Sequence, residues 1–441
     1  MKWCLALMAA ALASQARADV PKELADFVQK PDKAYEWKSK GKIETPVGVV
    51  YELAMTSQKW QDTTWTHGIQ IFVPKGAKPK ATMLLYNTGG SPSPTNAILG
   101  LAISERVKAP VAFLFGIPKQ PIYGLKEDGL IAETFTKYLA TEDASWPLLF
   151  PMAKSVVRAM DTLQAFAKEE WKTDVTGFVV TGASKRGWTS WLTAATGDKR
   201  VKAIIPMVID TLNFKVQMPH QLKSYGAYSE QIKDYVDRGL IDPKMPENPK
   251  SQKLWAMVDP WSYRENLTLP KVIINGTNDP YWTKDALNLY WDDLKGPKWV
   301  LYVPNAGHGL EEVHQDGKKD RDRILNTMSA AARWFIEDKK PPEMSWKHEG
   351  EGEAKAEPKF RVDGGKDAKL LRLWTADADT RDFRKAKCVS VDLKSNEGAW
   401  TGTLERPKVG FRATFAECEY DLDGLKYSLS TQIRILESAK K

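Results

Sequence analysis

Short apolar runs alternate with helical stretches along most of this chain, and this alternation limits the folds open to it. The clearest helical stretch is residues 152–171, where Val156, Met160, Leu163 and Phe166 recur at the 3.6-residue spacing of a buried helix face. Strand-like runs that alternate with helices predict a largely parallel sheet covered on both faces, an α/β architecture. The strand-like runs are residues 48–55, 69–73, 81–86, 111–115, 177–181, 201–208, 272–274 and 299–303.

The length of 441 residues predicts more than one domain, since a domain usually has roughly 100–200 residues. We assign residues 19–340 to the α/β domain, with an insert at about residues 212–260 where the periodic pattern breaks down. An insert between two sheet strands commonly forms a lid. Beyond residue 340 the sequence turns polar and then into short alternating runs. This pattern predicts a C-terminal all-β sandwich, of the immunoglobulin-like kind, over residues 341–441.

The N-terminus has the pattern of an export signal. Met1 and Lys2 precede an apolar run at residues 3–13 and an A-x-A site at residues 16–18. We expect cleavage after Ala18 and a periplasmic or secreted protein, with an uncleaved anchor as the alternative. The apolar run is too short to span a bilayer, and no later segment approaches the length and apolarity of a membrane helix.

Charge and cysteine content narrow the possible partners further. The net charge is +8, and basic and acidic residues are interspersed, as in residues 318–323, so we expect no nucleic-acid partner. Removal of the signal takes Cys4 with it and leaves Cys388 and Cys418. In an oxidising compartment we expect these two to form a disulfide; two isolated buried thiols are the alternative.

One turn carries the clearest catalytic pattern. The strand-like run at residues 177–181 leads into GASKRG, residues 182–187, and a helical stretch follows. A serine at such a turn is typical of the nucleophile elbow of an α/β-hydrolase fold, in which a strained backbone projects the hydroxyl above the sheet. The usual pattern is G-x-S-x-G. Here Ser184 is followed by Arg186 at the second glycine position and by Gly187 one residue later, and an ordinary Gly-Ser turn is the alternative.

Two later loops supply the partners that such a serine needs. In this fold the chain order is Ser, then Asp or Glu, then His. Asp279 and His308 each follow a strand-like run, at the carboxyl ends where open α/β sheets place their sites. The other four histidines precede the acid, lie beyond the domain boundary or fall near the last helix. We therefore predict Ser184 as nucleophile, His308 as base and Asp279 as orienting acid, with Asp210 as the rival acid.

The same chemistry needs backbone N–H groups that hold the oxyanion. Lys185, directly after the nucleophile, is expected to supply one, and Gly89 or Gly90 the other, from a loop after a strand-like run. A plain glycine-rich loop is the alternative reading. His308 and His314, with the acidic residues between them, do not match the spacing of zinc motifs, so we expect no metal and no cofactor.

Short motifs spread over most of the mature chain follow one another in a characteristic order. They are DFV (26–28), YEW (35–37), TSQKW (56–60), TH (66–67), NTGG (87–90), ED (127–128), AMD (159–161), TGASKRGW (181–188), VID (208–210), LPK (269–271) and PNA (304–306). In these motifs the chain resembles the PhoPQ-activated pathogenicity-related family of exported α/β-hydrolase-like proteins. The Ser-Lys-Arg-Gly-Trp elbow is itself a family feature, and glucuronoyl esterases have a similar elbow. The resemblance implies the fold and the triad rather than one reaction.

Charged residues near the elbow bear on the substrate. Lys185 and Arg186 either attract a carboxylate-bearing substrate or stabilise negative charge, or they are solvated or paired structural charges, and the sequence favours neither reading. Glu127 and Asp128 open a helix, where negative charge offsets the helix dipole. If that helix start faces the site, the two carboxylates would instead bind the terminal amine of a peptide.

Tryptophan is abundant, with 17 copies, and large aromatic side chains fill a core or line a binding site. Trp188 follows the predicted nucleophile and Trp282 the predicted acid, so we expect both near the substrate. Together these features predict a secreted serine hydrolase that cleaves a small ester or peptide through an acyl-enzyme, with an ester preferred. The alternatives are a non-catalytic binding or signalling protein on the same scaffold and an exported aminopeptidase or dipeptidyl peptidase-like enzyme.

Overall fold

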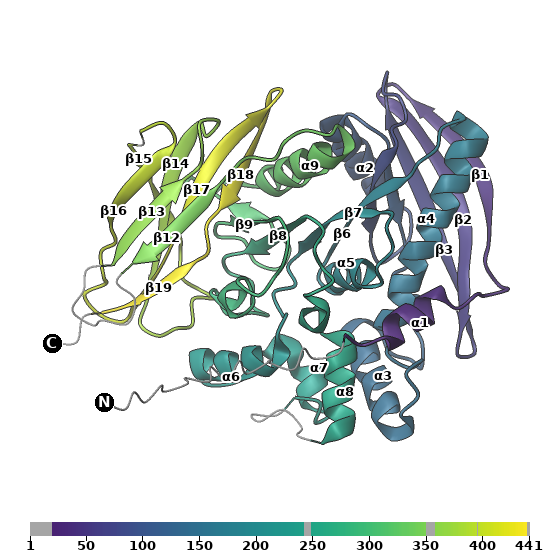
Figure 1. Cartoon of the computed structure of the whole chain (residues 1–441), viewed down its shortest axis with the longest axis horizontal. Coiled ribbons are helices and arrows are strands. Elements are labelled where there is room, and N and C mark those ends of the chain that lie inside the picture. The colour runs from purple at the N-terminus through teal and green to yellow at the C-terminus, as the bar shows by residue number, and fades with distance from the viewer. Residues whose placement is uncertain (1–19, 242–247, 350–357, 395, 439–441) are drawn as a thin grey trace, which may run out of the picture.

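The computed structural model describes residues 20–241, 248–349, 358–394 and 396–438 (Figure 1). The predicted signal, residues 1–18, lies outside these ranges. The central sheet has the strand order β1-β2-β3-β5-β4-β6-β7-β8-β9. These strands are β1 (Glu36–Thr45), β2 (Gly48–Trp60), β3 (Thr63–Pro74), β4 (Thr82–Asn87), β5 (Val111–Leu114), β6 (Gly177–Ala183), β7 (Val201–Met207), β8 (Lys271–Gly276) and β9 (Lys298–Val303).

The strands from β5 to β9 run parallel, and β1, β2 and β3 are antiparallel to their neighbours. The exchange of β4 and β5 in the order is the arrangement of the α/β-hydrolase fold. Every residue of β5 is buried, whereas most of β1 is exposed. A parallel strand covered on both faces reads as a continuous apolar run, which is why the sequence identified these strands directly. The predicted mostly parallel sheet is confirmed.

Helices cover both faces of this sheet (Figure 1). On one face lie α2 (Pro94–Val107) and α9 (Asp322–Ile336), and on the other lie α1 (Glu23–Gln29), α4 (Leu149–Trp171) and α5 (Lys185–Ala195). Two separate clusters of buried residues form the core, one on each face. The predicted apolar face of α4 is buried along its length. Among the described residues, no helix is long and apolar enough to cross a membrane.

The predicted insert between β7 and β8 is helical. It contains α6 (Phe214–Tyr225), α7 (Lys233–Val236) and α8 (Pro249–Val258), with the 3₁₀ turns η1 (Glu230–Ile232) and η2 (Pro260–Tyr263). Helices α7 and α8 pack against α3 (Glu127–Thr141), which follows β5 in the chain. In Figure 1 these helices form a group beside one end of the sheet.

The C-terminal part is all β, as predicted, but it is not separate from the central sheet. One sheet consists of β12 (Ser345–Glu349), β13 (Lys359–Asp363) and β16 (Ala399–Thr403). The other holds β14 (Leu370–Ala378), β15 (Val389–Leu393), β17 (Phe411–Leu422), β18 (Leu425–Ser430) and β19 (Arg434–Glu437). Ser430 of β18 pairs with Val300 of β9, so this second sheet continues the central one. A short hairpin, β10 (Glu312–Val313) and β11 (Lys319–Asp320), precedes α9, and the 3₁₀ turn η3 (Ala286–Leu289) lies between β8 and β9.

The expected disulfide is wrong, because Cys388 and Cys418 are both free and buried. Cys418 lies on β17 opposite Leu371 of β14, whereas Cys388 directly precedes β15, whose first residue pairs with Thr375 of β14. One strand therefore separates the two cysteines, and they are offset by about five residues along it. A disulfide needs Cα atoms within roughly 7 Å of each other, a distance that this arrangement exceeds.

Candidate active site

Ser184 occupies a strained junction between β6 and α5. Its backbone angles are φ 58° and ψ −129°, a combination that residues other than glycine rarely adopt. Its N–H donates to the carbonyl of Met207 on β7, at 2.8 Å, which ties the turn to the neighbouring strand. This is the geometry expected of a nucleophile elbow, and the side chain is only half buried.

Two glycines make the junction possible. A Cβ on Gly182 would lie 2.7 Å from the carbonyl oxygen of Arg186 and 2.8 Å from its Cβ. A Cβ on Gly187 would lie 2.7 Å from the Cγ2 of Ile209 and 2.9 Å from the carbonyl oxygen of Met207. The close approach of α5 to the sheet therefore depends on Gly187, one residue later than in the usual pattern, and Arg186 is accommodated because Gly182 opposite it has no side chain.

Asp279 and His308 form a hydrogen-bonded pair at the ends of β8 and β9. The Nδ1 atom of His308 lies 2.8 Å from Oδ2 of Asp279, whose side chain is buried. The other carboxylate oxygen accepts the N–H of Tyr281, at 2.9 Å, and the Tyr281 ring stacks on the imidazole at 4.3 Å between centroids. A carboxylate beside Nδ1 fixes the proton there and leaves the lone pair on Nε2, the atom that a general base uses.

The rival acid, Asp210, is hydrogen-bonded to a tyrosine. It follows β7 and is buried, and its Oδ1 accepts the hydroxyl of Tyr290 at 2.5 Å. Burial raises the pKa of Asp210 to about 7, and the nearby charges of Asp279 and Asp285 act in the same direction. A carboxyl that holds its proton up to neutral pH is a poor partner for an imidazolium, and this, with the 2.8 Å contact between Asp279 and His308, favours Asp279.

Ser184 and His308 line the same pocket. Both predicted aromatic residues, Trp188 and Trp282, border it, and the helical insert supplies part of its wall. Apart from the polar groups of Asp128, Ser184, Lys185 and His308, the lining is apolar or aromatic, as is usual for small-molecule sites. The apolar and aromatic residues are Trp188, Val208, Ile209, Phe214, Ile232, Tyr235, Ile241, Tyr281 and Trp282.

The charged residues beside the nucleophile are paired with one another. Glu127 receives two hydrogen bonds from the guanidinium of Arg186, at 2.8 and 2.7 Å, and the Lys185 ammonium lies 2.8 Å from its Oε2. Burial alone would raise the pKa of Glu127, but the bonds and charges of Arg186 and Lys185 outweigh it and lower the pKa to about 2. Asp128 lies 3.2 Å from the same ammonium and accepts the Tyr235 hydroxyl at 3.1 Å.

The predicted oxyanion donors lie in two places. Lys185 is the first residue of α5, so its N–H has no acceptor within the helix, and it borders the Ser184 cavity. Gly89 packs directly against the guanidinium of Arg186, and Gly90, with a φ of 65°, lines a neighbouring polar cavity that includes His67 and Lys119. The donor from this glycine loop remains a prediction.

Two contributions to the site were absent from the sequence reasoning. Tyr281, which stacks on His308, stands two residues after the acid in the run NDPYW, and its position was the only signal. Asn278 and Asn305 flank the acid and the base and bond to the C-terminal part, which no local pattern indicates. Within the described ranges, no group of three or more His, Cys, Asp or Glu side chains is arranged to hold a metal ion.

Comparison with known proteins finds a matching family model, a relative in sequence and several similar solved structures. A family model described as PhoPQ-activated pathogenicity-related protein matches residues 24–384. Autocrine proliferation repressor protein A of Dictyostelium discoideum is 31% identical over 435 residues, covering 90% of this chain and 85% of its own length. Acetyl xylan esterase 1 from Thermoanaerobacterium sp. JW/SL YS485 has a TM-score of 0.46 at 15% identity and covers 65% of this chain and 86% of its own. Glucuronoyl esterase from Solibacter usitatus has a TM-score of 0.40 at 13% identity, over 71% and 91% of the two chains.

Proposed function

This chain belongs to the PhoPQ-activated pathogenicity-related protein family, and from its own site we propose that it is a serine hydrolase. The observation that carries the proposal is the convergence of three groups. Ser184 stands at a strained elbow, and it lines the same cavity as His308, whose other ring nitrogen is bonded to buried Asp279. Strain at a residue that borders a cavity is the usual mark of a functional position.

In the proposed reaction, the Ser184 hydroxyl oxygen attacks an acyl carbon while Nε2 of His308 takes the hydroxyl proton. The C–O or C–N bond of the substrate then breaks, and His308 returns the proton to the leaving group. Water repeats the sequence on the acyl-enzyme. Asp279 orients the imidazole, and the N–H of Lys185, with that of Gly89 or Gly90, holds the oxyanion.

We propose an uncharged ester as the substrate class, before a peptide. The cavity wall is mostly apolar, which suits an acyl chain, and the two cations beside the nucleophile are neutralised by Glu127 and Asp128. The same pairing leaves these carboxylates engaged, so it does not favour the aminopeptidase alternative, in which they would bind a terminal amine.

We also propose that the protein is exported and that its C-terminal part is a domain of another type. An exported enzyme, periplasmic or secreted, would act on a small molecule without a cofactor, after removal of residues 1–18. The immunoglobulin-like sandwich over residues 341–441 is likewise proposed, and the two antiparallel sheets of this part support it.

A non-catalytic role in signalling is the second candidate. The specific observation in its favour is the name of the Dictyostelium relative, which describes a repressor of proliferation rather than an enzyme. In such a protein the elbow and the pair would persist as architecture, without turnover.

A fluorophosphonate probe separates the two candidates. We expect it to label the mature protein, to lose all labelling in Ser184→Ala, and to react at least 1,000-fold more slowly with Asp279→Asn, because the base then loses its orienting acid. Asp210→Asn should stay within about twofold of wild type. Absence of labelling in well-folded wild type would exclude the enzyme, and an intact Asp279→Asn beside an inactive Asp210→Asn would exchange the two acids.

The choice between ester and peptide follows from parallel assays of short acyl esters and aminoacyl amides with the same preparation. Turnover of the esters alone is expected. Turnover of the amides alone would make the ester proposal wrong.

A further inference from the structure

The loop after β14 reaches across to the loops that carry the acid and the base. Asn278 precedes Asp279, and its side-chain Nδ2 donates to the carbonyl oxygens of Ala386, Arg384 and Phe383, at 2.8, 3.1 and 3.4 Å. All three partners can only accept, which fixes the orientation of the amide. The residue next to the acid is thus held by a segment about 105 residues later in the chain.

The base loop is held by the same segment. Asn305 stands three residues before His308 and exchanges two hydrogen bonds with the backbone of Cys388. It accepts the Cys388 N–H at 2.7 Å and donates to the Cys388 carbonyl at 3.0 Å. Asn305 also has a φ of 55°, a left-handed conformation that asparagine tolerates better than most residues. Asn305 therefore makes this two-bond contact from a backbone conformation that few residues adopt.

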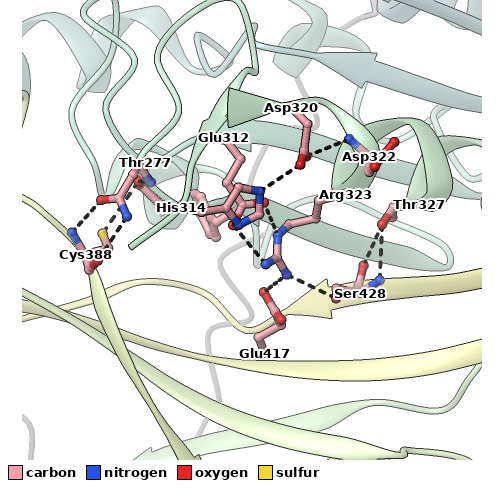
Figure 2. Close-up of polar contacts among 12 residues, drawn as sticks. Thr277, Glu312, His314, Asp320, Asp322, Arg323, Thr327, Cys388, Glu417 and Ser428 are labelled. Carbon is pink, nitrogen blue, oxygen red and sulfur yellow. Dashed lines mark hydrogen bonds and ion pairs between the residues drawn. The ribbon is translucent and has the colours of Figure 1, made fainter. Parts of the chain in front are cut away.

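Thr277 joins the two asparagines into one network. Its hydroxyl donates to Oδ1 of Asn278 at 2.8 Å and accepts the N–H of Asn305 at 2.8 Å. The N–H of Asn278 donates to the carbonyl of Ala306, at 2.9 Å. Figure 2 shows Cys388 beside Thr277, with its thiol 3.6 Å from the threonine hydroxyl. Hydrogen bonds therefore connect all three segments: the loop that carries Asp279, the loop that carries His308, and residues 383–388.

A second attachment to the C-terminal part lies after His308 in the chain. Arg323 of α9 bonds to both oxygens of Glu312, at 2.6 and 2.9 Å, and to Glu417 of β17 at 2.6 Å (Figure 2). Both carboxylates are buried, so this joint is a rigid connection between β10, α9 and the C-terminal sheet. The stretch that carries His308 lies between two attachments to the C-terminal part.

We propose that the C-terminal part completes the active site by positioning the acid–base pair, and that Asn278 and Asn305 are the positioning residues through which segment 383–388 acts. The inference rests on the proposed hydrolase function. A catalytic pair needs its side chains held within about 0.5 Å of the productive geometry, and loops reach that precision only through supporting hydrogen bonds. Here the support for Asp279 and His308 comes from outside the α/β part.

The test compares two asparagines that both tie the C-terminal part to the α/β part. Asn278 bonds next to the acid, whereas Asn288, in η3, donates to the Ile433 carbonyl at 2.8 Å and accepts from Gln432 at 2.9 Å, away from the cavity. We would measure kcat and KM for a short acyl ester, the fluorophosphonate labelling rate and Tm. The proteins compared are full-length wild type, Asn278→Ala and Asn288→Ala. Asn278→Ser, which keeps a shorter donor, serves if Asn278→Ala does not fold.

We expect Asn278→Ala to lower kcat and the labelling rate at least tenfold with KM changed less than twofold, and Asn278→Ser to fall between it and wild type. Asn288→Ala should lower Tm no more than Asn278→Ala does and keep wild-type kcat. Equal kcat values for the two alanine variants, in a labelled wild type, would overturn the inference and leave the hydrolase in place. A wild type that is folded but not labelled would overturn the proposed function, and this inference with it.

Discussion

The two halves of the site are built in different ways. On the nucleophile side, Ser184 is held by close packing between adjacent elements, where Gly182 and Gly187 let α5 approach β6 and β7. On the acid–base side, Asp279 and His308 stand on loops that side-chain amides bond to residues about 83 to 108 positions away. The nucleophile side depends on two glycines that have no side chain, and the acid–base side depends on side-chain amides that donate hydrogen bonds.

Because the two halves are built differently, we expect them to respond differently to substitution. A methyl group added at the elbow contacts packed atoms that cannot move independently of their neighbours. Ser184 itself is therefore displaced. Loss of an amide on the other side leaves the loops in place but less narrowly positioned, and the part-buried carbonyl groups of segment 383–388 lose their donor. We therefore expect substitutions in the first half to alter structure and activity together, and those in the second to alter mainly the rate.

The largest expected effect is at the elbow. Gly187→Ala places a Cβ 2.7 Å from the Cγ2 of Ile209 and 2.9 Å from a backbone oxygen, so α5 must shift away from the sheet and carry Ser184 with it. We expect kcat/KM to fall about 100-fold, because displacement of a reacting group by a fraction of an ångström to 1 Å costs that much, and Tm to fall as well. Steady-state kinetics and thermal unfolding measure both.

Gly129→Ala is the matched control for this substitution. Gly129 is also a buried helical glycine, in α3, but a Cβ there would meet its nearest atom, Oδ1 of Asp234, at an ordinary 3.4 Å. Alanine favours a helix over glycine by about 1 kcal/mol, so Tm should hold or rise with activity intact. An elbow variant that kept activity within threefold of wild type would remove the basis for the comparison between the halves.

The nucleophile half could be predicted from the sequence because its causes are local. Strand, turn and helix follow one another within about 20 residues, and the small residues that the turn requires appear beside Ser184. The order of Asp279 and His308 after it, at the ends of consecutive buried strands, followed from the parallel sheet. Those strands were identifiable because both of their faces are covered, so their apolar runs are unbroken.

The remainder depends on contacts between segments that are distant in the chain. Nothing local to Asn278 or Asn305 indicates that their partners lie near Cys388. The expected disulfide failed for the same reason, since an even pair of cysteines says nothing about the strand that separates them. The continuity of β18 with β9 also rests on a single pairing, at Ser430 and Val300, which no periodicity predicts.

A smaller effect is expected from the charge cluster on the nucleophile side. Glu127→Gln keeps an oxygen for Arg186 but leaves the Lys185–Arg186 pair with one uncompensated positive charge. We expect the ratio of kcat/KM for a hemisuccinate ester to that for a butyrate ester to rise about fivefold, on the order of 1 kcal/mol for a partly screened charge near the site. Glu142→Gln, at the other end of α3 and paired with Lys250, should leave the ratio unchanged. An unchanged ratio in both variants would mean that the cluster does not influence the substrate.

The smallest effect on activity is expected from Asp210, which follows β7, the strand next to the one that leads to Asp279. Burial raises its pKa from 3.8 to about 7, so between these values the folded protein keeps a proton that the unfolded chain has lost. The contribution of Asp210 to stability is therefore complete below about pH 4 and is lost as the pH rises through 7. Asp210→Asn, which cannot ionise and can still accept the Tyr290 hydroxyl, removes this slope.

We expect Asp210→Asn to match wild type in urea unfolding at pH 4 and to exceed it at pH 8 by a few kcal/mol at most, while activity stays within twofold. Other buried groups that titrate in this range are shared by both proteins and cancel in the difference. A stability difference that did not change with pH would show that Asp210 is ionised in the folded protein. In that case an ionised Asp210 would also be able to pair with an imidazolium, and the assignment of Asp279 would rest on its 2.8 Å contact with His308 alone.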